Sequence, residues 1–151
     1  MKIFESIREA LKNKEVRIVL PEGEEPRILQ ATKRIVKETN ITPVLLGNPD
    51  KISIYLEIEG ITEGYEVIDP SNCSCFEEMV TALVERRKGK MTTEEARKVL
   101  TEDVNYFGVM LVYLGKVHGM VSGAVHSTAA TVRPALQIIK TLPWEIGRAH
   151  V

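Results

Sequence analysis

The residues best suited to bind a substrate lie in one segment of small side chains, residues 122–134, which reads SGAVHSTAATVRP. It presents the hydroxyls of Ser127, Thr128 and Thr131 and the guanidinium of Arg133. Its glycine lets the backbone approach a ligand closely, and the N–H groups at the start of a following helix attract anions. Hydroxyl donors and an arginine fork suit phosphate or another oxyanion. The segment therefore predicts an oxyanion site.

The same segment also has a structural interpretation, a helix start capped by Ser or Thr with an arginine on the surface, and its composition favours neither. The nucleotide-binding patterns G-x-x-x-x-G-K-[ST] and G-x-G-x-x-G are absent. A general-base role for His126 lacks support, because no nucleophilic cysteine or G-x-S-x-G elbow accompanies it. We expect His126 to be placed by packing or by a hydrogen bond behind the site. The same weakness applies to Ser127 as a covalent nucleophile.

Two other segments carry charged groups. Residues 86–90, RRKGK, place cations at the end of an expected helix. There the helix dipole favours positive charge, and a solvated charge run is the usual role. Residues 21–26, PEGEEP, form a turn-rich acidic loop after an expected strand. That loop either contacts a substrate or leads acidic residues into a helix N-terminus, and its chemistry alone does not decide.

Short β-branched runs alternate with amphipathic segments, and this alternation predicts the elements that position these groups. Strands are expected at residues 16–20, 42–47, 65–70 and 119–123, and helices at 2–12, 26–38, 76–87, from 93 and at 103–114. Residues 134–140 are expected to begin or to continue a last helix. The crossovers are long enough for parallel pairing. The pattern predicts an α/β fold, a three-layer sandwich with a mostly parallel sheet, which binds ligands at the carboxyl ends of its strands.

Three local signals refine this picture. Asn48 and Pro49 favour a helix from there to about residue 58, although the isoleucines of that segment also fit a strand. Thr92 and Glu95 have the spacing of a capping box. In the last helix, Leu136 and Ile139 are expected to face inward, with Ile138 a further candidate.

Composition excludes several classes of protein. The chain has 151 residues, is 44% hydrophobic and 27% charged, and carries a net charge of −1. This predicts one compact domain that is too apolar for disorder and too balanced in charge for a nucleic-acid or membrane-surface protein. No run approaches the ~20 apolar residues of a membrane span, and the N-terminus alternates charged and apolar residues unlike a secretory signal. We therefore expect a cytoplasmic protein that binds neither nucleic acid nor membrane.

The cysteines and histidines point to no metal site. Cys73 and Cys75 form a C-x-C pair rather than the C-x-x-C of zinc or redox centres, and we expect them to be reduced thiols at the surface. The histidines, His118, His126 and His150, are scattered along the chain.

Three ordered segments resemble the phosphate acetyltransferase (phosphotransacetylase) family. They are residues 19–27, VLPEGEEPR; residues 106–112, YFGVMLV; and residues 122–141, SGAVHSTAATVRPALQIIKT. The resemblance runs from residue 1 to about residue 141. It implies the fold of the isocitrate and isopropylmalate dehydrogenases, an α/β three-layer sandwich, here incomplete.

The resemblance also implies the reversible transfer of an acetyl group between coenzyme A (CoA) and phosphate. The substrates would be CoA, acetyl-CoA, phosphate and acetyl phosphate, with no cofactor, metal or acyl-enzyme, because the CoA thiolate attacks directly. By motif position, Arg133 resembles a phosphate- or CoA-binding arginine and Arg87 resembles an arginine that binds CoA. Ser127, Thr128 and Thr131 would line the anion pocket. Two copies of the full-length protein would form a homodimer.

Members of this family are about twice as long as this chain. Their active site lies in a cleft between two domains, and the catalytic aspartate and a serine–arginine pair belong to the C-terminal part. We interpret residues 1–141 as the N-terminal part of the first domain, and expect an inactive fragment with a sheet edge and an apolar surface uncovered. Residues 145–151, EIGRAHV, match the translated start of a sequencing adapter, so we interpret residues 142–151 as a truncation boundary and non-native tail.

Three rival interpretations remain. A phosphate butyryltransferase shares the fold and the chemistry, although the length of the match at residues 122–141 favours acetyl. The acetyl-CoA-sensing module of some malic enzymes follows a large enzyme domain, whereas here Met1 opens directly onto the first helix. A Rossmann-like binding domain of other purpose would not explain three ordered motifs.

Overall fold

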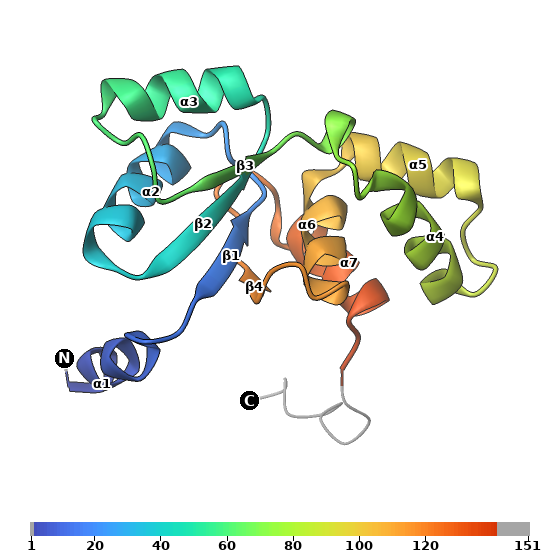
Figure 1. The fold of residues 1–151 in the computed structure, drawn as a ribbon. Coiled ribbons are helices and arrows are strands. Elements are labelled where there is room, and N and C mark those ends of the chain that lie inside the picture. Colours follow the sequence, from blue (N-terminus) through green and yellow to red (C-terminus); the bar gives the residue numbers. More distant parts are fainter. Residues whose placement is uncertain (1, 142–151) are drawn as a thin grey trace.

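The computed structural model describes residues 2–141, and its centre is a four-stranded parallel sheet (Figure 1). The strands are β1 (Val16–Leu20), β2 (Ile41–Leu46), β3 (Glu66–Ile68) and β4 (Gly119–Met120), in the order β3-β2-β1-β4. All three strand pairs are parallel. This confirms the predicted α/β fold with a mostly parallel sheet, although β3 and β4 are shorter than predicted.

The helices follow the predicted order. They are α1 (Lys2–Leu11), α2 (Pro26–Glu38), α3 (Pro49–Ile58), α4 (Phe76–Arg87), α5 (Thr93–Glu102), α6 (Val104–Tyr113) and α7 (Thr128–Ile138), with a 3₁₀ turn, η1, at Pro70–Asn72. Asn48 caps α3 through its side chain, which confirms the helical alternative for that segment. The predicted capping box of Thr92 and Glu95 is present at the start of α5. None of the helices between residues 2 and 141 is long and apolar enough to cross a bilayer.

Helices cover both faces of the sheet, as a three-layer sandwich requires (Figure 1). Neighbouring strand residues point to opposite faces, so Val19 and Leu20 of β1 enter different cores. Val19 belongs to the larger core, which centres on Phe107 of α6 and includes residues of α4 and α5. Leu20 belongs to the smaller core, beneath α2 and α3, which contains Leu29. The side chains of β1 therefore pack alternately against the helices on the two faces of the sheet.

The last helix begins before Pro134. α7 starts at Thr128, so Pro134 continues the helix, which is one of the two predicted possibilities. Leu136 is 57% exposed and Ile139 is 43% exposed, so the prediction that both face inward is wrong. Only Ile138 is fully buried, because α7 packs through Pro134 and Ile138, which lie one turn apart on the face toward α6.

Part of α7 is apolar and exposed. Val132 and Leu136 are one turn apart, Ile139 follows, and all three are exposed in residues 2–141. This agrees with the expectation of an uncovered apolar surface. The proposed truncation boundary and tail, residues 142–151, lie outside the described residues.

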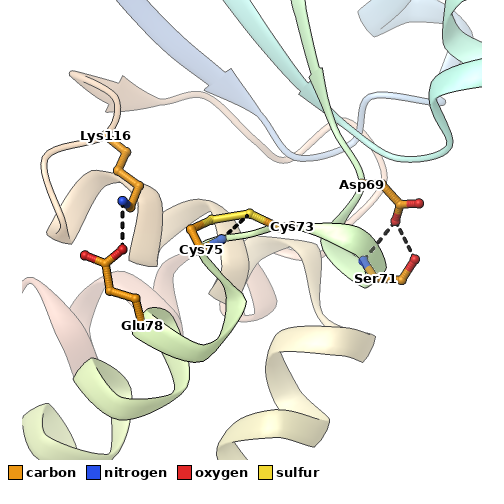
Figure 2. The surroundings of a disulfide bond; sticks show 6 residues. All are labelled: Asp69, Ser71, Cys73, Cys75, Glu78 and Lys116. Atoms are coloured by element: carbon orange, nitrogen blue, oxygen red, sulfur yellow. Dashed lines mark hydrogen bonds and ion pairs between the residues drawn. A yellow bond between two sulfur atoms is a disulfide. The ribbon is translucent and has the colours of Figure 1, made fainter.

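The two cysteines are joined by a disulfide, which corrects the prediction of reduced thiols. Figure 2 shows this bond at the start of α4, where the turn after β3 brings the Cα atoms of Cys73 and Cys75 to 5.3 Å. That separation is within the range that a disulfide requires. Both residues are half-buried against the larger core, beside an ion pair of Glu78 and Lys116 with N···O at 2.8 Å.

We predict that this disulfide contributes little to folding. Closing a loop of three residues removes little entropy from the unfolded chain, corresponding to about 1.6 kcal/mol on the chain-entropy account. Replacing both Cys73 and Cys75 by serine should lower the free energy of unfolding by no more than that amount in a urea titration. Reduction of the unmodified protein should give the same loss. Detection of two free thiols in the denatured, unreduced protein would contradict the assignment.

Candidate functional site

The segment that the sequence singled out, residues 122–134, is organised around a buried carboxylate. Glu22, just after β1, is 3% exposed at its side chain and accepts hydrogen bonds from the backbone N–H groups of four consecutive residues. The donor–acceptor distances are 3.1 Å for Gly123, 2.7 Å for Ala124, 2.8 Å for Val125 and 2.9 Å for His126. The backbone amides expected to bind a phosphate here are therefore occupied by the protein's own anion.

His126 completes this arrangement. Its ring Nδ1 lies 2.7 Å from Oε1 of Glu22, so the expectation of a histidine held by a hydrogen bond behind the site is confirmed. Because an ionised carboxylate only accepts hydrogen bonds, Nδ1 carries the proton. Burial raises the pKa of Glu22, but the hydrogen bonds from His126, Val125 and Ala124 outweigh it and lower that pKa from 4.5 to about 2. Glu22 is therefore a permanent negative charge at neutral pH.

Two glycines permit this contact. Gly23 packs so closely on β2 that a Cβ atom there would lie 2.5 Å from the carbonyl oxygen of Leu46. Gly123, whose amide donates to Glu22, has a φ of +109°, a region that residues with a side chain rarely adopt. The close packing of Gly23 and the backbone conformation of Gly123 together bring the Glu22 carboxylate to the loop.

The acidic loop after β1 also stabilises the start of α2 and the loop before α7. Glu25 caps α2 by accepting from the N–H groups of Arg27 and Ile28, which confirms the helix lead-in as one role of this loop. The Arg27 guanidinium donates to the carbonyl of Ala124 at 2.7 Å. The loop before α7 is thus held through its N–H groups by Glu22 and through a carbonyl by Arg27.

The three predicted hydroxyls lie at the start of α7. Ser127 is its N-cap and accepts from the N–H of Ala130 at 3.2 Å. Thr131 donates its hydroxyl to the carbonyl of Ser127 at 3.0 Å. Thr128, the first residue of α7, is exposed and lines an open surface depression together with Arg133 and Gln137. Two of these hydroxyls therefore build the helix start, and Thr128 lines the depression with Arg133.

The charges of the two predicted arginines act on one phenol. Burial and the charge of Asp103 raise the pKa of Tyr106, while the charges of Arg87 and Arg133 act in the opposite direction. Arg87 ends α4 and Arg133 lies on α7, so residues 46 positions apart in the chain act on the same side chain. The Tyr106 hydroxyl donates to Oε1 of Gln137 at 2.6 Å. Within residues 2–141, the buried Nε of Arg87 has no hydrogen-bond partner.

Arg86, the first cation of residues 86–90, has a structural role. Arg86 donates to the carbonyls of Ile138 and Ile139 at 2.6 and 3.2 Å, and so completes the end of α7. Its guanidinium also lies 5.3 Å from the ring centre of Tyr113. Arg86 lowers the pKa of Lys140 most, ahead of lost hydration and the neighbouring cations. Residues 86–90 therefore concentrate positive charge around Arg87.

The site thus combines two arginines, a phenol and a helix start on one side of the sheet. Such groups bind anions and hold them in place, since guanidinium forks and helix N-termini both favour phosphate. The sequence missed Glu22, Tyr106 and Gln137 as members of this site. Their partners are from 31 to 104 positions away in the chain, so no local spacing identifies them.

Comparison with known proteins agrees with this architecture. The sequence profile of the phosphate acetyl/butaryl transferase family matches residues 2–146. A phosphate acetyltransferase of Staphylococcus epidermidis is 50% identical over 138 residues, which are 91% of this chain and 42% of the relative. One from Bacillus subtilis is 47% identical over 140 residues, 92% of this chain and 43% of the relative. The chain thus spans less than half the length of these relatives.

Solved structures give the same result. A phosphotransacetylase from Streptococcus pyogenes superposes with a TM-score of 0.87 at 48% identity, over 94% of this chain and 43% of the other. The EutD phosphotransacetylase from Staphylococcus aureus has a TM-score of 0.84 at 45% identity, with the same coverage of both chains. With the family profile matched along nearly its whole length, this chain belongs to the phosphate acetyl/butaryl transferase family.

Proposed function

We propose that this chain supplies the substrate-anion site of a phosphate acetyltransferase. The enzyme transfers an acetyl group reversibly between CoA and phosphate. The observation that carries this proposal is the depression at the start of α7, where Arg133 lies with Thr128 and Gln137, the hydrogen-bond partner of Tyr106. The charges of both Arg133 and Arg87 also act to lower the pKa of Tyr106. Both substrates are polyanions, and converging guanidinium groups are the residues that recognise them.

In the proposed reaction, the CoA thiolate attacks the acetyl carbon of acetyl phosphate. The sulfur–carbon bond forms as the carbon–oxygen bond to phosphate breaks, and the thiol proton is released to solvent or to the departing phosphate. Arg133 and Arg87 hold the phosphate or CoA anions, and Thr128, at the positive end of α7, lines the same depression as Arg133. Ser127 and Thr131 contribute by fixing that helix start.

We place residues 1–141 in the N-terminal part of the first domain of a longer protein, whose other part would complete the active site. The relatives are more than twice as long as the matched region, and the apolar face of α7 at Val132, Leu136 and Ile139 is uncovered. We further propose that the transfer needs no metal or cofactor, and that the full-length protein is a cytoplasmic homodimer.

The test uses an extended chain, in which residues 1–141 are followed by the C-terminal remainder of the Staphylococcus epidermidis relative. We expect thioester formation from CoA and acetyl phosphate, unaffected by a metal chelator. We also expect kcat/KM for butyryl phosphate to be at least about tenfold lower, since one pocket distinguishes acyl chains by 1–3 kcal/mol per methylene. A preference for butyryl phosphate would assign the butyryl branch of the family, and absence of transfer to either would contradict the proposal.

A further inference from the structure

The Glu22 carboxylate occupies an anion-binding site that is formed mainly by backbone N–H groups. Its two oxygens accept four consecutive N–H groups and one imidazole N–H, all between 2.7 and 3.1 Å. Consecutive backbone N–H groups that converge in this way form a nest, a concavity that binds anions in many proteins. Here the nest comes from residues 123–126 and its anion from a loop about a hundred positions earlier in the chain.

This contact fixes the start of the substrate-binding helix. Ser127, which caps α7, directly follows the last amide that Glu22 holds. Thr128 is therefore two residues from His126, and Arg133 lies less than two helical turns further on, about 8 Å along the axis at 1.5 Å per residue. A shift of the loop would consequently move both groups that are proposed to hold the substrate.

No substrate anion can enter the nest while Glu22 fills it. The carboxylate is 3% exposed, and each of its oxygens already accepts at least two hydrogen bonds. The loop composition suggested both a structural role and an anion-binding role, and the structure assigns them to different groups. The backbone nest fixes the loop through Glu22, whereas the side chains of Thr128 and Arg133 are free to contact the substrate.

We propose that Glu22 is a positioning residue, an internal carboxylate that sets the loop of residues 123–126 and thereby the substrate-binding start of α7. Its effect on substrate affinity rests on the function proposed above, whereas its effect on the loop does not. Glutamine would be a poor replacement, because its NH₂ group would face N–H donors in place of an acceptor. Alanine would remove a fragment whose shape and charge match acetate.

The first experiment uses the 151-residue chain and NMR. In Glu22→Ala, the amide signals of residues 123–126 should move or broaden, and millimolar acetate should restore them toward their positions in the unmodified protein. Acetate should leave the unmodified protein unchanged, because its nest is filled. Unaltered amide signals in Glu22→Ala would overturn the proposal, as would altered signals that acetate does not restore.

The second experiment uses the extended chain. Glu22→Gln and Glu22→Ala should raise KM for CoA or acetyl phosphate about tenfold while kcat falls by less than about threefold, and formate or acetate should lower KM again in Glu22→Ala only. Glu24→Gln is the matched control, since Glu24 lies in the same loop but accepts from the N–H of Asn48 at α3 and should leave KM unchanged. An equal rise in KM in Glu22→Gln and in the control Glu24→Gln would contradict a positioning role. A fall in kcat with KM unchanged would contradict it as well.

The two experiments distinguish failure of the proposed function from failure of the inference about Glu22. An inactive extended chain would refute the proposed function, while the acetate titration of Glu22→Ala would still decide whether this carboxylate organises the loop. Restored amides together with an unchanged KM in the active extended chain would mean that Glu22 orders the loop without positioning the substrate, which would overturn the inference about affinity.

Discussion

Lowering the pH from 4.5 to 2 should remove about 3 kcal/mol of folding free energy through Glu22 alone. The folded state holds the pKa of this carboxyl at about 2, against 4.5 in the absence of these contacts. A depressed pKa stabilises the folded state above the unfolded value, and this contribution disappears as pH falls through the folded value. Urea titrations at a series of pH values between 7 and 2 measure the effect.

Glu22→Gln identifies the group responsible. The variant should be less stable than the unmodified protein at pH 7, and the two should converge as pH approaches 2. A smaller slope should remain, because hydrogen bonds from Arg27, Arg34, Lys33 and Arg97 lower the pKa values of Glu25, Glu38, Glu59 and Glu77, respectively. Parallel stability curves for the variant and the unmodified protein would exclude Glu22 as the source.

Removing either site arginine should weaken substrate binding by at least about tenfold. In the extended chain, Arg133→Ala and Arg87→Ala should each raise KM for CoA or acetyl phosphate by at least about tenfold, equivalent to 1.4 kcal/mol. Because both arginines act on Tyr106 and would hold the same anion, their effects should add to less than about 2.8 kcal/mol in the double variant. Initial rates over a range of substrate concentrations give each KM.

A matched arginine on the opposite face of the sheet provides the control. Arg34 of α2 is exposed and pairs with Glu38 at 3.1 Å, so Arg34→Ala should leave KM unchanged. The melting temperature of each variant separates lost binding from lost folding. Unchanged kinetics in Arg133→Ala would remove this residue from the site, and the same result in Arg87→Ala would remove Arg87.

Local patterns in the sequence predicted most of the fold. Pro26 and Pro49 mark helix starts and Thr92 with Glu95 marks another, because each supplies a cap or a fixed backbone angle within one turn. For α7 the sequence left two interpretations open, a helix start capped by Ser or Thr and an anion site, and it left open whether Pro134 begins or continues the helix. The structure supports the capped helix, because Ser127 is the N-cap and Pro134 lies inside α7.

The site was only partly predictable, for a different physical reason. Arg133 and the hydroxyls could be identified because they share one segment, and Arg87 came from the family resemblance. Glu22 lies in an acidic loop with no distinctive local pattern. Its role could not be predicted, because it depends on the fold bringing residues 123–126 next to it. The Cys73–Cys75 bond depends likewise on the turn after β3, which the C-x-C spacing does not specify.

We propose that this chain holds the substrate-anion site but only part of the active site. The most direct test is phosphate-dependent release of CoA from acetyl-CoA, measured by thiol formation, on the 151-residue chain beside the extended chain. We predict activity in the extended chain and none in the 151-residue chain. Phosphate-dependent CoA release by the 151-residue chain alone would contradict a divided active site, since all the chemistry would then lie within these residues.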